Sequence, residues 1–251
     1  MGITVKVHDY IVKRRREHPL HFTLLDPGKM DSDQLVELAI KTADAGTDGF
    51  MVGGSTDLSL EKVDSAVTAI KDITHMPVIL FPTHASSVSG KADAIFFMSL
   101  LNSESRQFLV GEQIASARWV QKTGLEPLSM AYLVVAPGMA AGKVGQAQPL
   151  PRDDIDLVVS HALAGQYLGM KYIYLEAGSG ASEPVPEKII SAVKESTDVT
   201  LIVGGGIRKP EVARQKVEAG ASFVVTGTII EENNNEDMLK KFAEAIHVNQ
   251  T

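Results

Sequence analysis

The sequence predicts an α/β fold, a modified (β/α)8 barrel of the TIM type whose eight strands form a parallel sheet. The chain has 251 residues, which is close to the roughly 250 residues of a typical barrel. Apolar runs of strand length alternate with helical patterns along the chain, and this alternation makes the sheet parallel. The last three apolar runs end in glycines just before a helical pattern begins, as the phosphate-binding loops of such barrels do.

The composition fits a single domain over residues 1–251 and excludes several classes of function. Hydrophobic residues make up 44% and charged residues 22% of the chain, as is ordinary for one globular domain. The formal net charge of −7 offers no overall basic surface to a nucleic acid or an anionic membrane. The absence of cysteine excludes disulfides, thiol nucleophiles and thiolate metal sites. With no signal-peptide pattern and no membrane-length apolar run, we expect a cytoplasmic protein without an integral membrane segment or a nucleic-acid partner.

The first half of the chain predicts four strands. Residues 5–17 form a short helical pattern with four consecutive basic residues. We interpret it as a solvated helix that closes the bottom of the barrel, and an anion-binding patch is the alternative. Asp31 or Ser32 should cap the helix after the first strand, and Gly46 should end it. The predicted elements are strands at 20–25, 49–52, 77–81 and 94–101 and helices at 32–45 and 59–73.

The connection between the third and fourth strands is too short to hold a helix. A parallel crossover normally needs at least a dozen residues for loop, helix and loop, and only roughly ten residues separate the two predicted strands here. The third helix of the barrel is therefore predicted to be missing or replaced. The resulting gap in the wall could hold a long hydrophobic ligand, or the connection could simply be shortened without binding anything.

The second half of the chain completes the eight units. Trp119 lies in a helical pattern and is expected to be a core or oligomer contact, in keeping with a homo-oligomer, either a dimer or an assembly of dimers. Residues 136–150 are rich in glycine and alanine and are interpreted as a mobile lid, because long loops at this face commonly are. The remaining predicted elements are helices at 105–123, 152–168, 186–196, 210–219 and 236–247 and strands at 128–135, 171–176, 200–203 and 223–225.

The sixth strand carries the strongest chemical signal. Its period of two places Tyr174 and Glu176 on one face. Gly178 and Gly180 follow, and glycines let backbone amides approach an anion closely. A tight turn after a buried strand is the alternative. The glycine runs after the seventh and eighth strands repeat the pattern, so a phosphate cradle shared by three loops is favoured.

Oxygen ligands follow the first two strands. Asp26 follows the first strand, and Ser55 and Thr56 follow the second, so a carboxylate and a hydroxyl should meet at the site face of the barrel. This pair suits Mg²⁺, which prefers oxygen ligands and binds substrate phosphates. An Asp–Pro turn without a metal is the alternative for Asp26. No zinc-type His/Glu spacing occurs, and the isolated histidines His21, His84 and His161 are expected to be surface or packing residues.

Five ordered motifs together resemble one known family. They are LLDPGK at 24–29, GGST at 53–56, YLEAGSGA at 174–181, VGGGIR at 203–208 and VTGT at 225–228. The combination is similar to the geranylgeranylglyceryl phosphate synthase family, to which the bacterial heptaprenylglyceryl phosphate synthases are related. The resemblance extends from the first strand to the eighth, and no motif departs from the family pattern.

The resemblance implies a barrel without its third helix and a prenyltransferase activity. The implied reaction moves a geranylgeranyl group from geranylgeranyl diphosphate to the 3-hydroxyl of sn-glycerol 1-phosphate, the first ether bond of archaeal membrane lipids. The implied cofactor is Mg²⁺, at the positions of Asp26 and Ser55. The implied sn-glycerol 1-phosphate positions are Tyr174, Leu175, Glu176, Ala177, Gly178, Ser179, Gly180, Gly205, Gly206, Gly227 and Thr228.

Two residues are the candidate catalytic groups of that reaction. Asp26 would hold the metal that neutralises the leaving diphosphate, with Lys29 sharing its charge. Glu176 would accept the proton of the glycerol hydroxyl, or it would only orient the glycerol. The prenyl tail is expected in the gap left by the third helix, with Val88, Ile95, Phe97 and Met98 as apolar candidates. The rival functions are a phosphosugar isomerase or aldolase and a non-catalytic binder of a phosphorylated metabolite.

Overall fold

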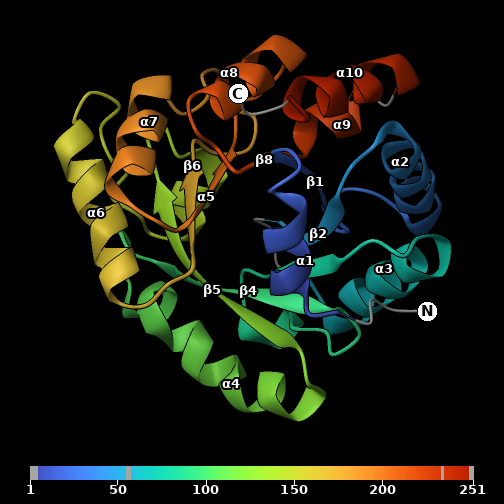
Figure 1. Ribbon diagram of the computed structural model, residues 1–251. Helices are drawn as coiled ribbons and strands as arrows, with labels where there is room; N and C mark the ends of the chain where they lie inside the picture. The colour runs from blue at the N-terminus through green and yellow to red at the C-terminus, as the bar shows by residue number, and fades with distance from the viewer. Residues whose placement is uncertain (1–4, 55–57, 233–234, 249–251) are drawn as a thin grey trace.

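The computed structural model describes residues 5–54, 58–232 and 235–248. Its strands form a closed barrel in chain order, and every neighbouring pair is parallel, including β1 with β8 (Figure 1). This confirms the predicted fold class. The strands are β1 Leu20–Leu25, β2 Gly49–Gly53, β3 Val78–Phe81, β4 Ala94–Leu100, β5 Glu126–Val134, β6 Tyr172–Glu176, β7 Thr200–Gly204 and β8 Phe223–Thr226.

Helices surround the barrel, and their ends follow from local chemistry. The Asp31 side chain accepts from the amide of Gln34 and so caps α2, while Gly46 ends that helix with a φ of 104°, a conformation that glycine adopts without strain. No helix within the described ranges is long and apolar enough to cross a membrane. The α-helices are α1 Val7–Arg14, α2 Ser32–Ala45, α3 Leu60–Ile73, α4 Glu112–Thr123, α5 Met139–Val144, α6 Ile155–Tyr167, α7 Glu187–Ser196, α8 Pro210–Glu218, α9 Thr228–Glu232 and α10 Glu236–Ile246.

The wall of the barrel lacks an α-helix between β3 and β4, as predicted. Residues 82–93 are all described and contain only the 3-10 turn η1, Ala85–Ser87. The two strands pair directly through Ile79 with Ala94 and Leu80 with Ile95, and Figure 1 shows only a thin connection between α3 and α4. After β4, the predicted helix at 105–123 is divided into the π-helical turn η2, Gln107–Gly111, and α4.

Alternate strand residues build two cores. Inward side chains, such as Phe22 and Phe223, fill the barrel, and their rings stack with centroids 4.7 Å apart. Outward side chains, such as Ile173 and Leu201, pack under the helices. In β6 this alternation turns Tyr174 toward the barrel interior, which is the face predicted for it.

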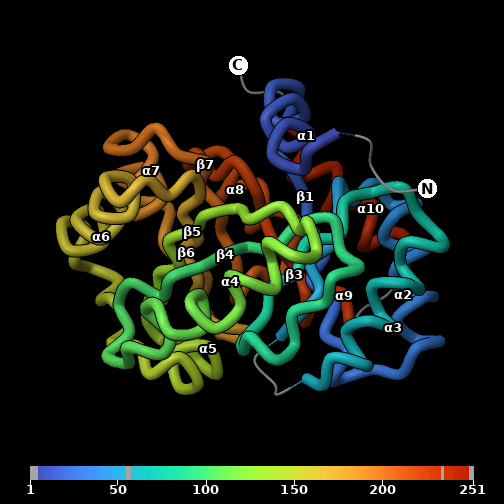
Figure 2. Tube along the Cα trace, turned by 90° about the horizontal axis from the view of Figure 1, so that it is seen from below, coloured from blue at the N-terminus to red at the C-terminus, as the bar shows by residue number. Residues whose placement is uncertain are grey.

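Helix α1 closes one end of the barrel. Val7 and Ile11 are buried against the inner core, while the Glu126 carboxylate at the start of β5 accepts from the amides of Val7 and His8 at 2.6 and 3.2 Å. Figure 2 shows α1 at one end of the molecule and α5 at the other. Arg14 takes part in this closure, since it pairs with Asp48 at 3.0 Å, whereas Lys13 is exposed. The predicted role of this helix is confirmed.

The loop after β5 is partly helical and is tied to the barrel. It contains α5, whose preceding Gly138 donates its amide to the Ala177 carbonyl at 2.9 Å. The buried Asn102 side chain donates to the carbonyls of Val134 and Gln148 at 2.9 and 2.7 Å. Residues 136–150, interpreted as a mobile lid, therefore contain a short helix and have hydrogen bonds to β5, to the loop after β6 and to the loop after β4. Their role as a lid stays a prediction.

Candidate active site

A cavity of about 170 Å³ opens where the strands end, on the side of the barrel that carries α5. Residues from the ends of β1, β5, β6, β7 and β8 line it, with Ala141 and Val144 of α5 on one side. Because the carboxyl ends of all parallel strands meet at one rim, residues far apart in the chain converge there. The predicted site residues that line the cavity are Asp26, Tyr174, Glu176, Ser179, Gly180, Gly205, Gly206, Gly227 and Thr228.

Three other predicted residues do not line the cavity, and a fourth lies outside the described residues. Leu175 and Ala177 point into the outer core under the helices. Gly178 donates its amide to the Glu176 carboxylate at 2.5 Å, so this amide is already engaged. Ser55 lies outside the described residues. The roles assigned to these four residues stay predictions.

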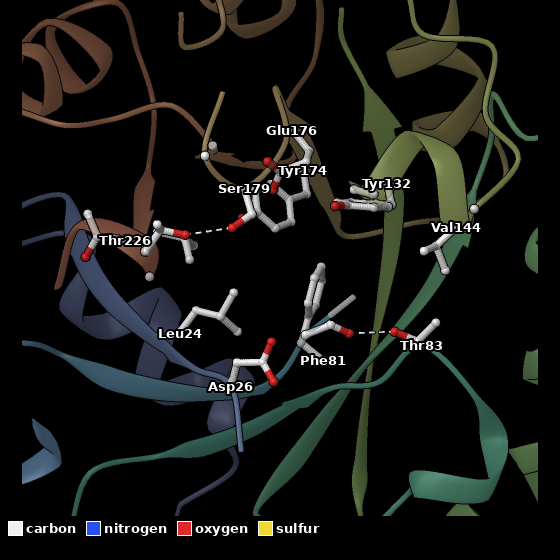
Figure 3. Close-up of a pocket in the computed structure, with 18 of the residues that line it drawn as sticks. Leu24, Asp26, Phe81, Thr83, Tyr132, Val144, Tyr174, Glu176, Ser179 and Thr226 are labelled. Carbon is white, nitrogen blue, oxygen red and sulfur yellow. Dashed lines mark hydrogen bonds between the residues drawn. The ribbon is translucent and has the colours of Figure 1, made fainter. Parts of the chain in front are cut away.

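Glu176 lies at the centre of a buried hydrogen-bonded group. Its side chain accepts from the Gly178 amide at 2.5 Å, and the hydroxyls of Tyr132 and Tyr174 lie beside it. Figure 3 shows the three labelled side chains together on one wall of the cavity, with Asp26 on the opposite wall. The two tyrosines come from adjacent strands, where Tyr132 pairs in register with Tyr174.

Burial is the largest influence on the pKa values of Glu176, Tyr132 and Tyr174. It raises the pKa of Glu176 above its ordinary value of 4.5, although the hydrogen bonds from Gly178, Tyr174 and Tyr132 act in the opposite direction. Burial, followed by the neighbouring Glu176 carboxylate, raises the pKa of both tyrosines well above 10. The tyrosines are therefore donors at neutral pH, and Glu176 is a carboxylate with an increased affinity for a proton.

Glycine is required where the loops after β6 and β7 meet. Gly205 and Gly206 have φ values of 82° and 70°, which other residues adopt only with strain. A Cβ at Gly205 would lie 2.2 Å from the Glu176 carboxylate, and one at Gly206 would lie 2.9 Å from the backbone of Glu183. The close packing of these two loops brings the backbone at Gly205 and Gly206 to the cavity.

Side chains join the three glycine loops into one rim. The hydroxyls of Ser179 and Thr228 lie 2.7 Å apart and connect the loops after β6 and β8. Arg208, after β7, donates to the Gly180 carbonyl at 3.1 Å and also lines the cavity. A guanidinium beside exposed glycine backbone is a favourable place for an anion such as a phosphate.

The Asp26 carboxylate lies on the other side of the cavity. It is 2% exposed and accepts from the Gly28 amide at 2.9 Å. A Cβ at Gly54 would lie 2.1 Å from it, so the backbone after β2 packs directly against the carboxylate. The Lys29 ammonium lies 3.8 Å from Asp26 and 3.4 Å from Glu231. A buried carboxylate beside the loop that leads to Ser55 is a donor set that fits Mg²⁺.

The lining residues that sequence reasoning missed include Tyr132, Arg208 and Glu231. Strand alternation in β5 could have placed Tyr132 on the inner face, and Arg208 lies inside the quoted VGGGIR motif. Glu231 gave no signal, because it depends on α9, a short helix that was not predicted. Burial raises its pKa, while Lys29 acts in the opposite direction.

A second, smaller hollow of about 20 Å³ adjoins the cavity at the gap in the wall. It shares Pro82, Thr83, Met98, Glu112 and Gln113 with the cavity. The four apolar residues predicted for a tail groove, Val88, Ile95, Phe97 and Met98, all line it. The apolar surface predicted at the missing helix is therefore present.

Other residues singled out in the sequence have structural partners. Buried His21 hydrogen-bonds with the Thr226 hydroxyl at 2.7 Å, and His84 pairs with Glu112 at 2.9 Å. His161 bonds within its own helix, to the Leu157 carbonyl. The Trp119 ring nitrogen donates to the Val88 carbonyl at 2.8 Å, yet the residue is 41% exposed. Trp119 is therefore hydrogen-bonded to the β3–β4 connection and does not lie in the core.

A family model described as the PcrB family matches residues 10–246. The chain belongs to the PcrB family. It is 48% identical to the geranylgeranylglyceryl phosphate synthase of Thermococcus kodakarensis, with 96% of each chain covered. A similar solved structure is the crystal structure of (S)-3-O-geranylgeranylglyceryl phosphate synthase from Thermoplasma acidophilum in complex with substrate sn-glycerol-1-phosphate. The two sequences are 44% identical. That comparison has a TM-score of 0.94 and covers 97% of this chain and 99% of the other.

More distant structures share only the fold with this PcrB family member. The tryptophan synthase alpha chain of Legionella pneumophila is 15% identical, with a TM-score of 0.62 over 97% of this chain and 98% of that one. At this identity the likeness says nothing about shared chemistry.

Proposed function

We propose that this protein is a prenyltransferase that joins a geranylgeranyl group to the 3-hydroxyl of sn-glycerol 1-phosphate. Its membership of the PcrB family and its likeness to a structure containing that glycerol phosphate support the reaction. The buried Glu176 carboxylate beside a rim of glycine backbone is the observation that carries the proposal. In the reaction the glycerol oxygen bonds to C1 of the prenyl chain, the bond from C1 to the diphosphate breaks, and the hydroxyl loses its proton.

The glycerol phosphate would bind on the wall of β6, β7 and β8. Its phosphate would lie against Gly205, Gly206 and Gly227, with Arg208 and the Ser179–Thr228 hydroxyl pair beside it. Backbone amides and a guanidinium hold a phosphate by charge-assisted hydrogen bonds. The glycerol hydroxyls then lie toward the inner face of β6, within reach of Tyr174 and Glu176.

Glu176 would accept the proton of the attacking hydroxyl. The carboxylate is buried and its pKa is raised, which makes it a better proton acceptor than an ordinary glutamate. Tyr132 and Tyr174 lie beside it and would hold it in one orientation. No covalent intermediate with the enzyme is needed.

The diphosphate of the donor would bind on the opposite wall. A Mg²⁺ ion held by Asp26 and Ser55 would neutralise the charge of the leaving diphosphate. Lys29 would exchange its contact with Glu231 for one with the diphosphate. The apolar tail would then pass Met98 into the hollow under the β3–β4 connection, where the barrel wall has no helix.

The rival functions have less support. A Schiff-base aldolase needs a lysine on a strand, and none of the eight strands in the described part of the chain carries one. A non-catalytic binder gives no reason for a carboxylate of raised pKa at the centre of the cavity. We also infer a homo-oligomer, since Val110, Ile114 and Trp119 on η2 and α4 are 41%, 61% and 41% exposed.

Mass spectrometry tests the proposal directly. The purified protein is incubated with Mg²⁺, sn-glycerol 1-phosphate and donors of fifteen to thirty-five carbons, with sn-glycerol 3-phosphate as the matched control acceptor. We expect a geranylgeranylglyceryl phosphate product from the first acceptor and little from the second. No product from any donor would support the binder, and conversion of phosphosugars in a parallel incubation, without prenyl transfer in the first, would support the isomerase or aldolase.

A further inference from the structure

Three metal-ligating side chains meet at the end of the barrel that α1 closes, away from the cavity. His18 follows α1, Asp48 precedes β2, and His247 follows α10. One ligand atom from each lies within 4.8 Å of the other two. Nothing in the proposed reaction uses these residues, since the cavity lies on the side that carries α5.

The carboxylate of Asp48 is buried and its two oxygens have different partners. The Arg14 guanidinium donates to Oδ1 at 3.0 Å, and Arg14 is itself balanced by Glu17 at 2.5 Å. The other oxygen, Oδ2, accepts from the His21 amide at 2.9 Å and lies 2.8 Å from His247 Nε2. The second oxygen is therefore the one that faces the imidazoles.

The ring of His18 is held in the tautomer that a metal ligand needs. Its Nδ1 lies 2.8 Å from the Pro19 carbonyl, which can only accept, so Nδ1 carries the hydrogen. The Nε2 lone pair of the neutral ring is then available, as it is in metal-binding histidines whose other nitrogen donates to a backbone carbonyl. The His18 and His247 rings have centroids 4.1 Å apart.

We propose that His18, Asp48 and His247 form a structural binding site for a transition-metal ion, with Zn²⁺ as the best fit. Two imidazole nitrogens and one carboxylate oxygen are ligands that Zn²⁺ accepts, while Mg²⁺ prefers oxygen alone. Bonds of about 2.1 Å allow at most about 4.2 Å between two ligand atoms, so binding draws the half-buried rings slightly inward. The ion would fasten the end of α10 to the segment between α1 and β1.

Zinc titration of the whole chain, after treatment with EDTA, tests this site. Asp26→Asn serves as the background because it removes the candidate cavity site. We expect one Zn²⁺ per chain in this background, with the affinity lowered at least tenfold in His18→Ala and His247→Ala. His161→Ala is the matched control, since His161 is also half-buried with Nδ1 on a backbone carbonyl, and it should bind like the background protein.

Two further measurements make the outcome decisive. Co²⁺ should give the visible absorption of a nitrogen- and oxygen-bound ion in the background protein and not in His18→Ala. In the Asp26→Asn background protein, Zn²⁺ should raise the unfolding temperature and Mg²⁺ should not. If His247→Ala does not fold, His18→Ala still decides, because it leaves the Asp48–His247 hydrogen bond in place. Absence of saturable Zn²⁺ binding, or equal binding by His18→Ala, would overturn the proposal and leave the cluster as a hydrogen-bonded ion pair.

Discussion

At the scale of single residues, the environment of Glu176 separates this site from a simple phosphate-binding turn. A carboxylate at the end of a buried strand could accept all its hydrogen bonds from the amides of the following turn, and Glu176 accepts one from Gly178. Two tyrosines from adjacent strands lie beside this buried carboxylate, which is only 7% exposed on the wall of the cavity. Such an arrangement is typical of a general base, whose efficiency depends on a pKa near the working pH.

Replacing Glu176 by glutamine should remove the proton acceptor while keeping its shape. We expect kcat to fall about 10²- to 10⁴-fold, with little change in the KM for glycerol phosphate. The acid limb of the wild-type kcat profile should lie above the ordinary glutamate value of 4.5, because the pKa of Glu176 is raised. The glutamine variant supplies the baseline, since any limb it retains belongs to the substrate phosphate. An unchanged kcat with a raised KM would show that Glu176 only orients the glycerol.

The same variant should be more stable than the wild type at neutral pH. A group whose pKa is raised on folding contributes stability below its unfolded pKa, and this contribution is lost as the pH rises through the folded pKa. Glutamine carries no charge to bury. The free energy of unfolding of Glu176→Gln should therefore exceed that of the wild type at pH 7, and the difference should vanish near pH 4. Urea unfolding at both values measures the difference in the free energy of unfolding. Equal stability at pH 7 would contradict the raised pKa.

Asp26→Asn should abolish turnover and leave the fold intact. The substitution removes a charged oxygen ligand while keeping the hydrogen bond from the Gly28 amide possible. Steady-state rates measured against Mg²⁺ concentration are the test, and circular dichroism checks the fold. Asp33→Asn, at an exposed position on α2, is the matched control. If Asp26→Asn works with the ordinary Mg²⁺ dependence, the metal belongs elsewhere.

At the scale of elements, the β3–β4 connection should decide which prenyl chain is accepted. Ala85 of η1 lines the small hollow, whereas neighbouring Ser86 is exposed and does not. Each buried methylene contributes about 0.8 kcal/mol, so Ala85→Trp should shift preference from the twenty-carbon donor toward the fifteen-carbon donor. The ratio of kcat/KM for the two donors is the measurement, and Ser86→Trp should leave it unchanged.

Ala94 is an unsuitable site for this test, although it lies in the predicted range. Its side chain points into the barrel core and is fully buried. A tryptophan there would overpack the core and destabilise the whole protein. An unchanged donor ratio in Ala85→Trp would place the tail outside this connection.

At the scale of the whole molecule, α1 completes a barrel that would otherwise be open at one end. The Glu126 carboxylate holds the two first amides of α1, and Val7 and Ile11 cover the inner core. Losing a helix cap costs about 1 kcal/mol. Glu126→Ala should lower the free energy of unfolding by about that amount and leave kcat/KM unchanged, because the cavity is at the other end. Exposed Glu195→Ala on α7 is the control and should change neither quantity.

The sequence alone determined the elements and much of the rim of the cavity. The bounds of β1, the Asp31 cap of α2 and the missing third helix were all predicted, because strand period, capping and connection length are local properties. The glycine loops after β6, β7 and β8 were also predicted from the sequence, since glycine is needed wherever loops pack this closely. The parallel alternation then fixed which strand ends meet, and so which predicted residues share one cavity.

Only the tertiary structure decided the partners of those residues. Tyr132 reaches Glu176 because β5 pairs with β6 in a particular register, and Glu231 reaches Lys29 through a short helix without a sequence signal. His18, Asp48 and His247 meet although the sequence offered no metal-ligand spacing. The physical reason is closure of the barrel, which pairs β1 with both β2 and β8 and brings the residues that flank these strands and α10 to one point.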